Sequence, residues 1–234
     1  FMTTTNVSSG GNFIIHSREP DKGWSDPVWV DQGGIDPSLL FDDDGKVYYT
    51  TAGADEKGRS CILISELDPF TGEKFTESRI LSYGCGGRYP EGPHLYKING
   101  KYYLMLAEGG TEYGHMETMQ RAENPYGPYE PCPHNPILSH KEDLREQIYC
   151  TGHADLLEDA NGNWWLVCLA TRPCGGKNNR VMMHNLGRET FLSPVVWDAD
   201  GWPVVGDHGL IDLEMEGPLP GKVEPVCRDF REDF

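Results

Sequence analysis

Short apolar segments rich in Val, Ile, Tyr, Trp and Leu alternate with turns rich in Gly, Pro and Asp along nearly the whole chain. Segments of this length, bounded by turn residues, predict β-strands rather than helices. Only residues 140–148 have a pattern compatible with a helical turn or two. The longest apolar run, residues 164–170, is too short to cross a bilayer. The pattern therefore predicts an all-β protein.

Three hairpins in the chain are related to one another. Each has an Asp-Gly or Asn-Gly turn followed by paired aromatic residues, and they occupy residues 36–49, 91–103 and 153–165. A tight hairpin turn requires positive φ, which explains the turn glycines Gly45, Gly100 and Gly162. These glycines are 55 and 62 residues apart. A period of this size with about four strands per repeat predicts a β-propeller.

The remaining strands follow from this repeat. We expect third strands at 61–67, 117–121 and 181–185, and fourth strands marked by a recurring Leu-Ser at 81–82, 138–139 and 192–193. Residues 2–5, 12–17 and 27–30 read as the second to fourth strands of a preceding blade. The predicted organisation is a partial blade at 1–30, three blades with the active-site pocket at 31–209, and a linker at 210–234.

Three blades and a partial one do not close a ring, since propellers have at least four blades. We therefore expect the natural protein to extend upstream of Phe1. An open ring exposes strand edges and apolar blade faces. A second chain or self-association is expected to cover them.

The charge narrows the range of partners. The chain has 37 Asp and Glu against 20 Lys and Arg, a formal net charge of −17. Nucleic acids and anionic membranes require clustered basic residues, so neither is an expected partner. A neutral partner fits this balance.

The seven cysteines form no Cys-x-x-Cys pair, which predicts reduced thiols and a cytoplasmic rather than a secreted protein. Residues 84–87, Gly-Cys-Gly-Gly, are not a phosphate-binding loop because no Gly-Lys-Ser/Thr follows. Residues 42–45, Asp-Asp-Asp-Gly, lack the spacing of a calcium loop and are interpreted as a solvated hairpin turn.

The residues nine positions before the three turn glycines are Asp36, Glu91 and His153. In a propeller this position lies near the central axis, so two carboxylates and an imidazole are predicted to converge there. Glycoside hydrolysis uses such a carboxylate pair, one to protonate the leaving oxygen and one to activate water or attack. A structural role remains open, because Asp before Pro and Glu before Gly-Pro often occur in turns.

The chain resembles glycoside hydrolase family 43, especially its β-xylosidase and α-L-arabinofuranosidase branch. The resemblance covers about residues 1–215 and rests on motifs in family order: Gly34-Ile35-Asp36-Pro37-Ser38-Leu39, Glu91-Gly92-Pro93-His94-Leu95-Tyr96, Ala107-Glu108-Gly109-Gly110-Thr111, Gly152-His153-Ala154-Asp155-Leu156, and Leu186-Gly187-Arg188-Glu189-Thr190-Phe191.

The resemblance implies a five-bladed propeller with inverting chemistry. It implies that Glu91 is the general acid and that Asp36 raises its pKa and orients it. His153 would lie beneath the sugar near the axis, where members hold a calcium ion or a water, so His153 is the candidate metal residue, directly or through water. Arg188 would reach the sugar hydroxyls. No cofactor is required.

Four further residues are candidates for substrate binding. Ile35 and Thr111 lie in the matching motifs, and His94 and His115 follow Glu91 in its hairpin or the loop after it. For both histidines a structural role is an equal alternative.

The family's general base has no counterpart in this chain. By the repeat spacing it is expected roughly 80 residues before Phe1, and the end of the chain resembles the opening of a β-sandwich. We predict an exo-acting, inverting glycosidase for β-1,4-xylo-oligosaccharides, terminal α-L-arabinofuranosyl groups, or both. The alternatives are a sugar-binding propeller without catalysis and, with less support, a protein-interaction propeller. This chain alone is expected to hydrolyse little.

Overall fold

The computed structural model describes residues 1–8, 10–141, 143, 147–174 and 184–218. Within these residues the chain is all β, with fifteen strands in four antiparallel sheets and no helix. Strands that follow one another in sequence are neighbours in every sheet. The described part of the chain has no helix long and apolar enough to span a membrane. The expected helical turn is absent from the described residues of 140–148; residues 142 and 144–146 lie outside them.

The first sheet has three strands, and their order confirms the predicted partial blade. They are β1 (Met2–Thr5), β2 (Asn12–Ile15) and β3 (Val28–Val30). The second sheet is a complete four-stranded blade made of β4 (Ile35–Phe41), β5 (Val47–Ala54), β6 (Ser60–Glu66) and β7 (Arg79–Ser82). Its first hairpin turns at Gly45, where φ is 82°. Glycine takes this conformation without strain.

The third and fourth sheets repeat this arrangement. The third consists of β8 (Glu91–Ile98), β9 (Lys101–Glu108), β10 (Met116–Ala122) and β11 (Glu130–Pro131). The fourth consists of β12 (Tyr149–Glu158), β13 (Trp164–Thr171), β14 (Glu189–Trp197) and β15 (Pro203–Val205). Gly100 and Gly162 turn the two first hairpins with φ of 79° in both cases.

Two strand predictions are wrong, because both assumed that a Leu-Ser pair marks the fourth strand of every blade. Leu192 and Ser193 belong to β14, the third strand of its sheet, where they pair with Val167 and Leu166. The predicted third strand at 181–185 is therefore misplaced: residues 181–183 lie outside the described part, and residues 184–185 are not in a strand. Leu138 makes one isolated bridge to Glu117, while β11 is the fourth strand of the third sheet.

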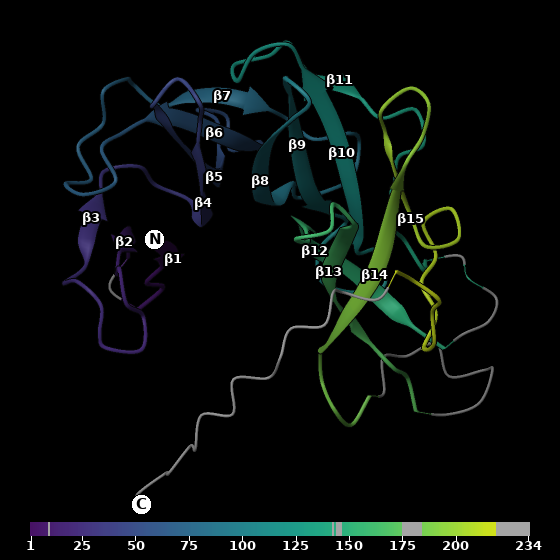
Figure 1. Cartoon of the computed structure of the whole chain (residues 1–234). Helices are drawn as coiled ribbons and strands as arrows, with labels where there is room; N and C mark the ends of the chain where they lie inside the picture. The colour runs from purple at the N-terminus through teal and green to yellow at the C-terminus, as the bar shows by residue number, and fades with distance from the viewer. Residues whose placement is uncertain (9, 142, 144–146, 175–183, 219–234) are drawn as a thin grey trace, which may run out of the picture.

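The four sheets follow one another along an arc, as the blades of an incomplete β-propeller (Figure 1). The first strands of successive blades meet on the inner side, where β4 contacts β8 and β8 contacts β12. Successive blades pack face to face, and each of the three interfaces contains a separate apolar core. The core between the first two sheets contains Ile14, Val30, Val47, Tyr49 and Leu67.

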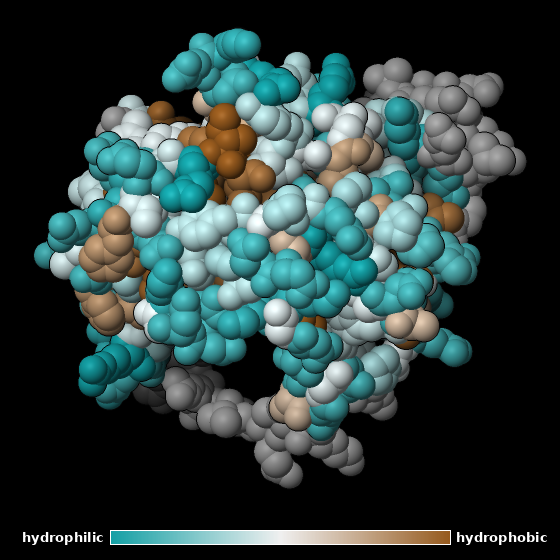
Figure 2. Space-filling view, turned by 90° about the horizontal axis from the view of Figure 1, so that it is seen from above, coloured by the Kyte–Doolittle hydropathy of each residue, from teal (hydrophilic) through white to brown (hydrophobic). Residues whose placement is uncertain are grey.

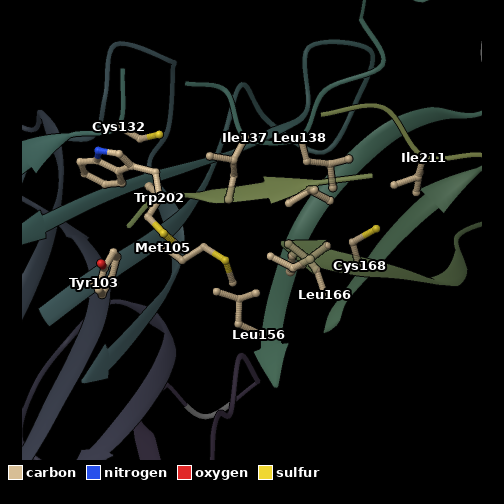
Figure 3. Close-up of a cluster of buried hydrophobic side chains, with 14 of the residues drawn as sticks. Tyr103, Met105, Cys132, Ile137, Leu138, Leu156, Leu166, Cys168, Trp202 and Ile211 are labelled. Carbon is tan, nitrogen blue, oxygen red and sulfur yellow. The ribbon is translucent and has the colours of Figure 1, made fainter. Parts of the chain in front are cut away.

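The other two cores are larger. Between the second and third sheets, side chains of β5 and β6 pack on those of β8 and β9; the buried members are Tyr48, Ala52, Ile62, Ile64, Leu95, Tyr102, Leu104 and Leu106. Figure 3 shows the core between the third and fourth sheets, where Met105 of β9 faces Leu156 and Leu166 of the last blade, with Tyr103 and Trp202 at one side.

A polar link joins the second and third blades beside these apolar contacts. Asp42 was predicted to lie in a solvated turn, but its side chain is fully buried. It accepts a hydrogen bond from Lys97 Nζ at 2.5 Å and one from the hydroxyl of Tyr102. Burial of a carboxylate requires such partners.

The face of the molecule that Figure 2 shows is largely hydrophilic.

Candidate active site

The three inner strands share one irregularity near their starts. Pairing with the neighbouring strand shifts register between Ile35 and Ser38 in β4, between Glu91 and His94 in β8, and between Gly152 and Asp155 in β12. Such bulges turn a side chain away from the regular alternation. Each contains a residue with positive φ: Asp36 at 51°, Gly92 at 54° and His153 at 50°. Positive φ in non-glycine residues is strained and is concentrated at functional sites.

The bulges bring Asp36, Glu91 and His153 together, as the repeat predicts. The backbone N–H of Gly92, next to Glu91, donates to Asp36 Oδ2 at 3.1 Å. His153 Nε2 lies 3.5 Å from the same oxygen. One carboxylate of the second blade therefore contacts the first strands of both following blades. All three side chains are half-buried and keep access to solvent.

The two carboxyl groups have pKa values displaced in opposite directions. Burial raises the pKa of Glu91, and the negative charge of Asp36 raises it further, against opposing effects of His153 and Arg188. Burial alone would raise the pKa of Asp36, but the hydrogen bond and charge of His153 and the Gly92 N–H outweigh it, so this pKa is lowered. Two carboxyls whose environments separate their pKa values can divide acid and base roles.

His153 belongs to the same charge network. Its hydrogen bond to Asp36 raises the pKa of the imidazole, against the effect of burial. The ring lies directly over Gly92, where an added Cβ would be 3.1 Å from Cε1 and Nε2 of the ring. Gly92 thus meets two requirements, positive φ and room for the imidazole.

His153, the candidate metal residue, has Asp36 as its carboxylate partner. Among the described residues, no group of three or more His, Cys, Asp or Glu side chains could hold a metal ion. A metal at His153, directly or through water, stays a prediction.

His94 lies on β8 between the neighbouring inner strands. Its Nδ1 is 3.3 Å from Ser38 Oγ in β4 and 3.1 Å from Asp155 Oδ1 in β12. Burial lowers the pKa of His94, although the Asp155 carboxylate opposes this. The imidazole is partly accessible, so it is both a cross-link between three blades and available to a ligand.

The other predicted binding residues are exposed. Ile35 is exposed beside Asp36, and Thr111 is exposed in the loop after β9. Arg188 is exposed in the segment before β14, close enough for its charge to oppose the upward shift of the Glu91 pKa. These three side chains are thus accessible to a ligand.

His115 has a different environment from the one expected of a binding residue. It is fully buried, and its Nδ1 is 2.9 Å from the carbonyl oxygen of Cys150. Its ring lies under Gly152, where an added Cβ would be 2.7 Å from Nε2. A ring without solvent access cannot contact a substrate, so the geometry makes His115 a support for β12.

Glu117 was not singled out from the sequence. It is fully buried on β10 and accepts a hydrogen bond from the backbone N–H of Ala154 at 3.1 Å, next to His153. Burial raises its pKa well above the usual range, although backbone N–H groups of Ala154 and His153 oppose the shift. The sequence gives no signal for it, because β10 also contains the polar residues Thr118, Gln120 and Arg121.

Known proteins match this chain along most of its length. Residues 1–203 match the family Glycosyl hydrolases family 43. The "Non-reducing end alpha-L-arabinofuranosidase BoGH43B" of Bacteroides ovatus is 45% identical over 96% of the chain and 41% of its own length. A "Xylosidase/arabinosidase" of Butyrivibrio fibrisolvens is 44% identical over 94% of the chain and 44% of its own length.

Solved structures of the same family have a similar fold. A "GH43_12 retrieved from capybara gut metagenome" has a TM-score of 0.81 and 40% identity, covering 95% of this chain and 42% of that one. The K247S mutant of the GH43 protein BlXynB from Bacillus licheniformis has a TM-score of 0.80 and 39% identity, with 94% and 42% covered. The chain spans about two fifths of the length of these relatives. It belongs to glycosyl hydrolases family 43.

Proposed function

We propose that the protein carrying this chain is an inverting, exo-acting glycosidase in which Glu91 is the general acid. The observation that carries this proposal is the Asp36–Glu91 arrangement, in which one carboxyl has a lowered pKa and the other a raised one. A general acid must be protonated before it meets the leaving oxygen, and a neighbouring negative charge keeps it protonated to higher pH.

The roles of the chain's own residues follow from this geometry. Glu91 donates its proton to the glycosidic oxygen as the bond to the sugar breaks. Asp36 remains ionised and holds Gly92 N–H and His153 in place. The sugar contacts three exposed side chains, those of Arg188, Thr111 and Ile35. Inversion further requires a carboxylate base, roughly 6.5–9.5 Å from the acid so that a water fits between them. We do not assign that base to Asp36 or to any other residue of this chain.

The substrates that we propose are β-1,4-xylo-oligosaccharides and terminal α-L-arabinofuranosyl groups of plant hemicellulose. This rests on the relatives, which are named as an arabinofuranosidase and a xylosidase/arabinosidase at 45% and 44% identity. The same names disfavour sugar binding without catalysis. The excess of acidic residues is compatible with a neutral saccharide.

The test is turnover of nitrophenyl β-xyloside and nitrophenyl α-L-arabinofuranoside by the intact protein. Glu91→Ala is expected to lower kcat by about 2–4 orders of magnitude on xylobiose, whose leaving group needs protonation, and by less on the nitrophenyl glycosides. Glu130→Ala, at an exposed ion pair on the outer strand β11, should match the wild type on both. Proton NMR of the first product should show the inverted anomer. Wild-type binding of xylobiose in a calorimeter without turnover would instead support the sugar-binding alternative.

A further inference from the structure

The glycine-rich loop that leads into Glu91 is folded around a buried carboxylate. Residues 83–90 connect β7 to β8 and include Gly84, Cys85, Gly86 and Gly87. The sequence excludes a phosphate-binding role for this loop. In the structure its backbone N–H groups point at Glu108, the last residue of β9, whose side chain has no solvent exposure.

Both oxygens of Glu108 accept hydrogen bonds from the loop. Oε1 accepts from the N–H of Cys85 at 2.6 Å and Oε2 from the N–H of Gly87 at 2.5 Å. The hydroxyl of Thr118 on β10 donates to Oε1 at 2.7 Å. Successive backbone N–H groups form an anion-binding concavity, and here the anion is supplied by the chain itself.

The glycines are needed for this close approach. An added Cβ at Gly84 would be 3.0 Å from both oxygens of Glu108. At Gly87 it would be 2.6 Å from Glu108 Cβ and 2.5 Å from Met116 Cε. Gly84 and Gly86 also have positive φ, 84° and 111°. The composition of the motif thus follows from wrapping the loop around one carboxylate.

The neighbours of Glu108 hold the far end of the same loop. Ala107, just before it, pairs with Glu91 across the β8–β9 ladder. Gly109, just after it, donates its N–H to the carbonyl of Arg88 at 2.6 Å. Three consecutive residues therefore fix the loop: Glu108 holds its middle, Gly109 holds Arg88, and Ala107 holds Glu91.

We propose that Glu108 is a positioning residue that sets the place of Glu91 by anchoring the loop before it. The anchoring part stands on the hydrogen bonds alone; its effect on catalysis rests on the proposed function of Glu91. A loop released from Glu108 lets the first residue of β8 move, and a displacement of about 1 Å at a catalytic group can lower the rate about 100-fold.

The anchoring can be measured without any activity assay, through Cys85 in the loop. Its thiol is partly buried, with Sγ 3.8 Å from the Met119 carbonyl, and burial raises its pKa to about 11, so it should react slowly. In the intact protein, Glu108→Gln places an amide NH₂ against backbone donors, and it also removes a charge that raises the Cys85 pKa. Iodoacetamide labelling of Cys85 should still be at least about tenfold faster than in the wild type after each rate is divided by the thiolate fraction found from its pH dependence. Fully buried Cys61 on β6 is the internal reference.

Mass spectrometry of the two cysteine peptides gives the ratio. Unchanged labelling of Cys85, or an equal rise at Cys61 that signals general unfolding, would overturn the anchoring. Thr118→Val, which removes one donor to Glu108 and keeps the side-chain shape, should change the ratio in the same direction by less, and it replaces Glu108→Gln if that variant does not fold.

Kinetics test the effect on Glu91. Glu108→Gln should lower kcat about 10–100-fold with KM within about threefold. The loss should be larger with xylobiose than with a nitrophenyl glycoside, since an activated leaving group needs little protonation. Glu130→Gln is the matched control and should leave both rates unchanged. Equal losses on both substrates would overturn the positioning role. A wild type with no turnover would refute the proposed function, while the labelling ratio would still decide the anchoring.

Discussion

At the scale of single residues, the candidate site depends on how charge is distributed over three groups. Asp36 has the lowered pKa, His153 the raised imidazole pKa, and Glu91 the raised carboxyl pKa. Asp36 is the common partner, because it stabilises the positive charge on His153 and disfavours a negative charge on Glu91. A change at Asp36 therefore alters both neighbours at once.

Asp36→Asn should move the high-pH limb of kcat/KM to lower pH. Activity requires protonated Glu91 and is lost as pH rises through its pKa; the charge of Asp36 raises that pKa, so its removal lowers it. His153 would also lose its partner and some positive charge, which acts in the opposite sense. That effect on Glu91 is the smaller one, so the net shift is downward. The measurement is a pH–rate profile on xylobiose, whose leaving group needs protonation.

Asp43→Asn is the control, because Asp43 is highly exposed in the first hairpin turn. Its profile should superimpose on that of the wild type. A high-pH limb of Asp36→Asn that stays in place or moves upward would contradict the charge coupling between the two carboxyls.

The sequence predicts the meeting of Asp36, Glu91 and His153, because equivalent positions of a repeat meet at a propeller axis. It does not predict Glu108 or Glu117. Their hydrogen bonds join β9 to the loop before β8 and β10 to β12, contacts that no spacing rule encodes. For the same reason, the sequence does not predict that His115 is buried under Gly152.

At the scale of elements, the bulge at the start of each inner strand matters most. The hairpin turns were predictable, since Asp-Gly and Asn-Gly have one dominant conformation in tight hairpins. The third strand of the last blade was not. The segment between β13 and β14 is longer than its counterparts in the other blades, so the Leu-Ser match assigned Leu192 to the wrong strand.

Gly92→Ala should impair the protein more than Gly100→Ala. Both glycines have positive φ, 54° and 79°, so both substitutions carry a similar backbone strain of about 1–2 kcal/mol. Only at Gly92 does the new Cβ meet a neighbour, the ring of His153 at 3.1 Å, while nothing lies within 4 Å at Gly100. We expect Gly92→Ala to displace His153 and lower kcat at least about tenfold beyond Gly100→Ala.

Steady-state kinetics and urea unfolding of the two variants make this comparison. Similar losses of stability with unequal losses of kcat are expected. Equal kcat values would mean that the position of the His153 ring does not matter to catalysis.

At the scale of the whole molecule, stability is divided among three interfaces between blades. Leu104 lies in the core between the second and third blades and is fully buried. Leu104→Ala should lower the free energy of unfolding by about 2–5 kcal/mol, through lost burial and the cavity left behind. Leu186→Ala, at a side chain that is 66% exposed, should change it by less than about 0.5 kcal/mol.

Urea denaturation followed by tryptophan fluorescence measures both values. A loss below about 1 kcal/mol for Leu104→Ala would indicate that the blades do not depend on this core for their stability. Comparable losses in the two variants would contradict the separation into buried interfaces and exposed rims.

Asp36 and Glu91 belong to different blades, and the apolar core between those blades determines how far apart they are. The molecule is thus a row of blades, and the seams between them set the spacing of its charged groups. Mechanical softening of one seam would change the proton affinity of the acid without any alteration near the sugar. Adaptation to temperature or acidity could therefore proceed through hydrophobic substitutions far from the axis.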